Sequence, residues 1–178
     1  MLKKHSDLQL GFNGERAVGE ELNAVIRKGG YVFHDFPADP TWNIDHIAVT
    51  SAGVFMIETK TRRKRKGKAG EKDYEVVFDG QALKFPHGTD SHGLQQAKDN
   101  ARWLSHWLGK AVGERVPVLP ILTLPGWWVV RKANNDVKVL NPKEIQSVIC
   151  ADAHRALSDQ MIQRIVHQLD QKCRDVSF

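Results

Sequence analysis

The chain has 178 residues, 41% of them hydrophobic, which is enough to form a core in one domain spanning residues 1–178. Its first residues lack the apolar stretch of a secretory signal, and its longest uncharged run, residues 116–130, contains three prolines and is too short to cross a bilayer, so we expect no membrane contact. Cys150 and Cys173 lack the spacing of metal ligands, which favours reduced thiols and a cytoplasmic location.

The first predicted element is a helix from Asn13 to about Lys28, ended by two glycines. Apolar residues recur along it at helical spacing and mark a buried face, namely Ala17, Val18, Leu22, Val25 and Ile26. Glu15 precedes Val18 by three residues, so it projects from the same face and can reach inward. An acid in the first turn is also favoured by the helix dipole, and Glu15 alone therefore fits a purely local role as well.

A short strand over residues 31–36 is followed by two apolar strands, residues 44–50 and 54–60, around a tight turn. A hairpin with a two-residue loop places Asp45 opposite Glu58. A shift of one residue along the chain pairs Asp45 with Lys60 instead. Because side chains alternate with period two, both registers keep Asp45, Glu58 and Lys60 on one face of the sheet, and only a loop of odd length separates them.

Both faces of these two strands are apolar, as expected for a sheet that helices cover on both sides. One face adds Ile47, Val49, Val54 and Met56 to the charged residues, and the other carries Ile44, Ala48, Phe55 and Ile57. An ionised carboxylate inside such a layer costs several kcal/mol unless a metal or a cation compensates it. Two acids and a lysine at these positions therefore predict a functional site. His46 points to the opposite face in a regular strand, and we expect a structural role for it.

A run of basic residues follows the second strand directly. It consists of Arg62, Arg63, Lys64, Arg65, Lys66 and Lys68. Such a cluster is typical of a phosphate-binding patch, because each cation placed on a polyanion releases condensed counterions. A solvated loop between strands explains the same run equally well, but its position beside buried acids favours nucleic acid as the partner.

The middle of the chain predicts a hairpin and a long helix. Strands over residues 74–78 and 81–85 flank Asp79-Gly80, and the helix should run from Asp90 or Ser91 to about Lys110. Gln96 and Asn100 lie on one flank of its apolar stripe and can touch the site. Trp103 and Trp107 share that flank, and we expect them to pack in the core.

The last third of the chain predicts further strands and two helices without recognisable chemistry. The strands cover residues 116–124, 127–131 and 137–140, and the prolines in the first of them predict a bent or edge strand. Asn141-Pro142-Lys143-Glu144 is typical of a capped helix start. A closing amphipathic helix covers residues 158–172.

Together these motifs resemble the nuclease-related domain family, usually called NERD, of the PD-(D/E)xK nuclease superfamily. The resemblance covers about residues 11–126 and rests on Gly11-x-x-Gly14-Glu15, Ile44-Asp45-His46-Ile47, Gly53-Val54-Phe55, Ile57-Glu58-Thr59-Lys60, Gly80, Gln96-Ala97, Asn100-Ala101 and Pro125-Gly126. It implies an α/β fold with a mixed central β-sheet flanked by helices and a restriction-endonuclease-like, nuclease-related core in residues 11–126. Residues 127–178 are expected to complete the domain.

The shared face of Asp45, Glu58 and Lys60 leads to the first functional hypothesis, Mg²⁺- or Mn²⁺-dependent hydrolysis of phosphodiester bonds in DNA. Asp45 and Glu58 would bind the ion, with the Thr59 carbonyl oxygen as a third ligand and Glu15 in support. Lys60 would orient the attacking water or stabilise charge on the phosphate. Gln96 would position water or phosphate.

Two other hypotheses stay open. The chain is alternatively a nucleic-acid-binding module without turnover that uses the basic run from Arg62 to Lys68, in which case its affinity falls steeply with salt. A scaffold whose basic loop meets an acidic protein is the third. The buried acids argue against a pure binder, because carboxylates next to a polyanion gain it nothing.

Overall fold

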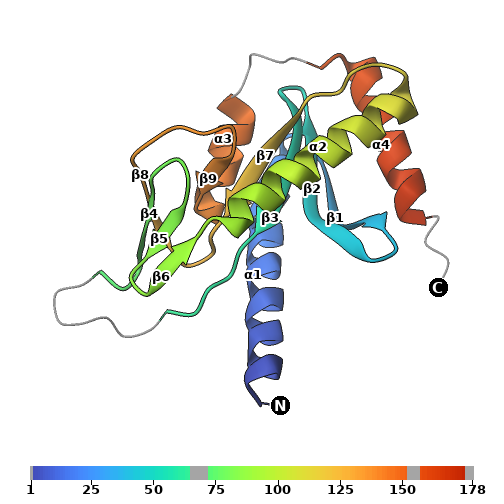
Figure 1. Cartoon of the computed structure of the whole chain (residues 1–178). Coiled ribbons are helices and arrows are strands. Elements are labelled where there is room, and N and C mark those ends of the chain that lie inside the picture. Colours follow the sequence, from blue (N-terminus) through green and yellow to red (C-terminus); the bar gives the residue numbers. More distant parts are fainter. Residues whose placement is uncertain (1, 65–71, 152–156, 175–178) are drawn as a thin grey trace.

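The computed structural model describes residues 2–64, 72–151 and 157–174 (Figure 1). It has a mixed α/β fold in which helices flank two mixed sheets, consistent with a restriction-endonuclease-like core, so the predicted fold class is confirmed. The prediction of one central sheet was incomplete, because the chain after Lys60 builds a second sheet beside the first. Three members of the basic run, Arg65, Lys66 and Lys68, lie outside the described residues.

The first sheet has five strands in the order β1-β2-β3-β7-β9. Their bounds are Tyr31–Asp39 for β1, Trp42–Thr50 for β2, Gly53–Thr59 for β3, Val118–Thr123 for β7 and Lys138–Leu140 for β9. β1, β2 and β3 run antiparallel, whereas β7 and β9 run parallel to β3. β7 is therefore not an edge strand. Its Pro120 is tolerated because β9 pairs with β7 only from Ile121 onward.

The second sheet has four short strands in the order β6-β5-β4-β8. They cover Glu75–Phe78 (β4), Leu83–Phe85 (β5), Gly88–Asp90 (β6) and Trp128–Arg131 (β8). The predicted β4–β5 hairpin is confirmed; Phe78 pairs with Leu83, and Gly80 adopts a left-handed φ of 95° in its turn. Strand β6 was not predicted, since Gly88-Thr89-Asp90 carries no apolar alternation.

Helices cover both faces of the first sheet (Figure 1). They are α1 (Leu2–Arg27), α2 (His92–Val112), α3 (Ile145–Ala151), preceded by a short 3₁₀ turn over Pro142–Glu144, and α4 (Asp159–Arg174). Buried residues of α1 and α3 pack against Ala48, Phe55 and Ile57 on one face. Buried residues of α2 and α4 pack against the other face, around Ile47 and Met56. Among the described residues, no helix is long and apolar enough to cross a membrane.

Helix α1 begins at Leu2, so the predicted start at Asn13 was wrong. Within residues 8–12, the large apolar residues Leu8 and Phe12 are 67% and 61% exposed and therefore mark no buried stripe that periodicity can detect. Of the predicted buried face of α1, Val18, Leu22 and Val25 are buried, whereas Ala17 and Ile26 are exposed, so the prediction was wrong for these two.

The β2–β3 hairpin has the register that the two-residue loop predicts. Thr50 pairs with Gly53, and the ladder continues to His46 paired with Ile57. The next residues in this register are Asp45 and Glu58, which the register therefore brings to the same end of the hairpin. One inner position was wrong: Ile44 packs in the α2-side core instead of with Ala48. It lies close to the shift in the β1–β2 register between Phe36 and Asp39.

Candidate active site

Asp45 lies where the strands β2 and β3 separate. Beyond the last ladder pair, its Oδ2 accepts a hydrogen bond of 2.7 Å from the backbone N–H of Thr59. A side-chain carboxylate thus replaces a backbone carbonyl as the partner of β3. This bond holds Asp45 at the end of the hairpin, half-buried, instead of letting it turn toward solvent.

Glu58 is 6% exposed and is held by two amides of α2. Gln96 Nε2 donates to its Oε1 at 2.6 Å, and Asn100 Nδ2 donates to its Oε2 at 3.1 Å. The two donors are four residues apart and therefore lie on one flank of the helix, as the sequence predicts. Two hydrogen bonds fix the rotamer of the carboxylate, and each oxygen keeps a lone pair for another partner.

A third acid, Asp35 on β1, lies across the sheet from Asp45 and Glu58. His34 pairs with His46 and Phe36 pairs with Ile44, so the residue between them, Asp35, stands opposite Asp45 on β1. Asp35 has a left-handed φ of 49°, a conformation that Asp tolerates better than most residues. Sequence reasoning missed Asp35 because the strand over residues 31–36 was not aligned with its neighbour.

Lys60 directly follows β3 and forms an ion pair with Asp90, with 4.0 Å between Nζ and Oδ2. The other oxygen of Asp90 accepts from the backbone N–H of His92, at the start of α2. Asp90 therefore links the lysine to the helix that carries Gln96. The sequence pattern identifies Asp90 only as a helix start, because its contact with Lys60 depends on strand β6.

Glu15 belongs to the same cluster by electrostatics. It is half-buried on α1, and its pKa is raised by burial and then by the charges of Asp45 and Asp35. Its neighbour Gly14 lets the helix approach the exit of β3 closely, because a Cβ at Gly14 would lie 2.1 Å from the Thr61 Cγ2 atom. A glycine is therefore required before Glu15 for α1 to pack this closely against the end of β3.

The carboxylates raise one another's pKa values. Burial raises the pKa of Glu58 to about 7, the charge of Asp45 adds to the effect, and the Asn100 hydrogen bond and Lys60 oppose it. The pKa of Asp45 is also raised, mainly by burial, although the Thr59 N–H bond lowers it. The cluster therefore holds more negative charge than the nearby lysine offsets, which is the electrostatic condition for binding a cation.

The donor set fits a hard divalent ion that keeps several water ligands. The Thr59 N–H donates to Asp45, and in a strand the carbonyl of the same residue points to the same side as its N–H. Two carboxylates and a carbonyl oxygen suit Mg²⁺ or Mn²⁺. A cage of protein side chains is absent: within residues 2–64, 72–151 and 157–174, no group of three or more His, Cys, Asp or Glu is placed to hold a metal ion.

The described start of the basic run is anchored to two aromatic rings, those of Phe85 in β5 and of Trp127, which directly precedes β8. The Arg62 guanidinium lies 4.4 Å from the centroid of the Phe85 ring and donates to the His87 carbonyl. Lys64 Nζ lies 5.7 Å from the centroid of the Trp127 ring. These cation–π contacts direct the chain out of β3 along the second sheet. Arg63 stands between the two anchored residues.

A match to the family model of the nuclease-related domain covers residues 10–125. The chain belongs to the nuclease-related domain (NERD) family. Its placement in the PD-(D/E)xK superfamily is consistent with this domain. The matched region contains the predicted site residues Glu15, Asp45, Glu58, Lys60 and Gln96, and the further contacts Asp35, Asp90 and Asn100.

An uncharacterized protein of Bacillus anthracis is 36% identical over 64 residues, which is 34% of this chain and 30% of that protein. The alignment thus spans less than a third of that relative. No solved structure matched the chain.

The histidines and tryptophans near the site have packing roles. His46 is buried, and its Nδ1 shares a 2.8 Å hydrogen bond with His34 Nδ1. Burial, together with His34, lowers the pKa of His46 to about 4. Trp103 and Trp107 pack against the core, with Trp42 and Phe36 as ring partners, so their predicted packing role is confirmed.

Proposed function

We propose that this NERD protein is a nuclease that hydrolyses phosphodiester bonds, with DNA as its substrate and Mg²⁺ or Mn²⁺ as its cofactor. The observation that carries the proposal is the buried Glu58 carboxylate, which two amides of α2 hold beside Asp45 and two residues before Lys60. Among the described residues Glu58 forms no ion pair, and a buried acid with a raised pKa and no such partner is costly, which is typical of functional sites.

The ion would be held by Asp45, Glu58 and the Thr59 carbonyl, with Glu15 in support from α1. When bound, it would supply Lewis-acid charge at the phosphate and lower the pKa of a water molecule. The protein prepares this position in advance. The Thr59 N–H fixes one carboxylate, and Gln96 and Asn100 fix the other, so neither has to be ordered when the ion arrives.

Lys60 is the residue that touches the phosphate in this proposal. Lys60 follows Glu58 by two positions, just past the end of β3, and Asp90 restrains its ammonium from the second sheet. In this place it stabilises negative charge that develops on phosphate oxygens, or orients the attacking water. The basic run from Arg62 to Lys68 continues from this position and would contact the backbone phosphates of the substrate.

Nucleic-acid binding without turnover is the second candidate. The anchoring of Arg62 and Lys64 on aromatic rings favours it, because the basic run is thereby presented next to the cluster. A pure binding role predicts that neutralising Glu58 leaves the affinity for nucleic acid nearly unchanged. It does not explain why several acids lie together inside a nucleic-acid interface.

A cleavage assay of the Glu58→Gln and Lys60→Ala variants on plasmid and on single-stranded DNA distinguishes a nuclease from a binding module without turnover. We expect the unaltered protein to cleave only with Mg²⁺ or Mn²⁺ and both variants to lose cleavage while keeping the fold by circular dichroism. Glu20→Gln is the matched control, since this residue is 69% exposed on α1. Metal-dependent cleavage that persists in both variants would refute the assignment.

A further inference from the structure

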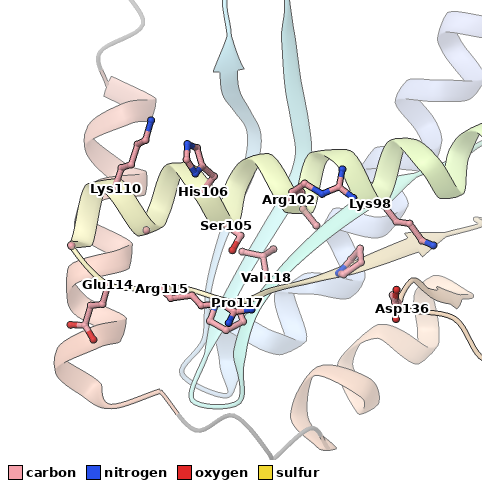
Figure 2. A pocket seen from close by; sticks show the side chains of 14 residues that line it. Lys98, Arg102, Ser105, His106, Lys110, Glu114, Arg115, Pro117, Val118 and Asp136 are labelled. Atoms are coloured by element: carbon pink, nitrogen blue, oxygen red, sulfur yellow. The ribbon is translucent and has the colours of Figure 1, made fainter.

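A large groove lies on the other flank of α2, away from the acid cluster. It has a volume of about 1030 Å³ and runs between α2, the segment before β7 and the turn before β9 (Figure 2). None of Glu15, Asp45, Glu58 or Lys60 lines it. At 100° per residue, Lys98 on its rim is rotated by about 200° from Gln96, which contacts Glu58.

Four basic side chains follow one another along the rim of this groove. Lys98, Arg102, His106 and Lys110 recur every four residues on α2, and Figure 2 shows them in succession along the helix. Residues spaced by four are neighbours on a helix surface. At a rise of 1.5 Å per residue, the column is about 18 Å long. Arg115 adds a further cation on the opposite wall.

Most of this positive charge is not compensated by acids. Among the described residues, Lys98, Lys110 and Arg115 form no ion pair, whereas Arg102 pairs with Asp99 at 3.0 Å. One of the two acids in the groove, Glu114, is itself paired with Arg164 at 2.6 Å. Lys98 and Arg102 are like charges spaced by four residues and repel each other slightly, and an anionic ligand would relieve this repulsion.

The floor of the groove favours a phosphate backbone over a protein partner. Ala101, Ser105 and Gly109 form the helix side of the floor, and Pro117 and Val118 form part of the other. The lining contains no Leu, Ile, Met, Phe, Tyr or Trp. Protein interfaces obtain most of their affinity from such large anchors, whereas nucleic-acid interfaces are polar and strongly positive.

We propose that this groove is a second nucleic-acid-binding surface that holds backbone phosphates along the column from Lys98 to Lys110. Over about 18 Å, a B-form duplex presents roughly ten phosphate charges, enough for every cation of the column to find a partner. The proposal does not depend on hydrolysis at Glu58, because binding alone is required.

The test is the salt dependence of binding in EDTA, where metal-dependent cleavage cannot occur. The Lys98→Ala/Lys110→Ala double variant is compared with the unaltered chain, by fluorescence anisotropy, on a labelled duplex of about 30 base pairs and on the matching single strand. The control is Arg27→Ala/Lys28→Ala, which removes two exposed charges at the end of α1, on the other face of the sheet.

Losing two phosphate contacts should reduce the slope of log affinity against log salt by about 1.8 for duplex and about 1.4 for single strand. Between about 50 and 200 mM salt, the unaltered protein would then lose about tenfold more duplex affinity than the double variant. The control should keep the original slope, and Lys98→Arg/Lys110→Arg should restore it, which separates loss of charge from a packing defect.

Two results would overturn the proposal. One is an unchanged slope in the folded alanine variant on both nucleic-acid probes. The other is a variant that keeps its nucleic-acid affinity but loses binding to a labelled poly-glutamate peptide, which would identify the groove as a surface for acidic protein.

Discussion

Helix α2 separates two charged regions that are built in opposite ways. On one flank, Gln96 and Asn100 hold the buried Glu58 within a row of acids. On the other flank, the basic side chains of the column lie along the rim of a wide groove that has few acidic partners. Negative charge is therefore buried and fixed by hydrogen bonds, whereas positive charge is exposed and weakly restrained.

This difference implies two kinds of recognition. A buried, pre-oriented acid cluster suits a small cation and acts over a few ångströms, so single substitutions there should have large effects that salt does not reverse. An exposed column of cations suits an extended polyanion and acts through many weak contacts, so each substitution should have a small effect that depends on salt.

The largest expected effect is on the rate of DNA cleavage, and it tests the difference between the acid cluster and the column of cations. Lys60→Ala should lower the rate of DNA cleavage by about 10²–10³-fold, because it removes a charge next to the reacting phosphate. The loss should be the same at low and high salt. Lys98→Ala/Lys110→Ala should instead cleave at the normal rate at low salt and weaken only as salt rises. A Lys60 variant whose cleavage recovers at low salt would place this residue in general phosphate binding.

The second prediction concerns pH and stability in the absence of metal. Because burial raises the pKa of Glu58 from 4.5 to about 7, the contribution of Glu58 to the stability is fully present below about pH 4.5 and is lost as the pH rises through 7. The difference corresponds to roughly 3 kcal/mol at most. Glu58→Gln should therefore be more stable than the parent by about 1–3 kcal/mol at pH 8, with the gap closing toward pH 5.

Urea unfolding of both proteins in EDTA across this pH range measures the effect. The matched control is Glu20→Gln, whose stability should follow that of the parent at every pH. A gap between parent and Glu58→Gln that stays constant from pH 5 to pH 8 would contradict the burial of an ionising carboxylate at this position.

The third prediction compares one glycine from each region. Gly14→Ala should destabilise the protein by about 1–2 kcal/mol, because the new Cβ would overlap Thr61 at 2.1 Å. Gly109→Ala in the groove meets only the Glu114 carbonyl at 3.5 Å, an ordinary contact. There the gain in helix propensity, up to about 1 kcal/mol, should dominate. Thermal unfolding of the two variants measures both effects. Equal shifts in Tm would contradict the close packing of Gly14 against Thr61.

The smallest expected effect is on the stability of the groove variants. Lys98→Ala and Lys110→Ala should each change the free energy of unfolding by less than about 0.5 kcal/mol, since neither residue has an ion pair among the described residues. Urea unfolding tests this. A loss above about 1 kcal/mol would give the column a structural role.

The acid site was accessible to sequence reasoning because its residues break a strong local pattern. Asp45 and Glu58 interrupt apolar strands, and the two-residue turn fixes their register, which the structure has. Asp35 and Asp90 were missed. Their places depend on the β1–β2 register and on strand β6, which are set by contacts between segments and not by local pattern.

The groove beside α2 could not be predicted from the sequence pattern in the same way. Cations at every fourth position are common on exposed helix faces, and only the packing of α2 against the segment before β7 turns this face into a groove wall. The start of α1 was misjudged for a related reason, because an exposed stretch of helix around Leu8 and Phe12 leaves no buried stripe to detect. Sequence pattern therefore predicts what is buried better than what is exposed.

Direct titration of Mn²⁺ is the most direct test of a cation bound between Asp45 and Glu58. The electron paramagnetic resonance signal of free Mn²⁺ decreases when the ion binds, and it needs neither substrate nor turnover. The parent should bind Mn²⁺ above about pH 7, where Glu58 is ionised, and bind it progressively more weakly as Glu58 is protonated below that pH. Asp45→Asn and Glu58→Gln should each abolish saturable binding. Equal Mn²⁺ binding by the parent and both variants would contradict the account.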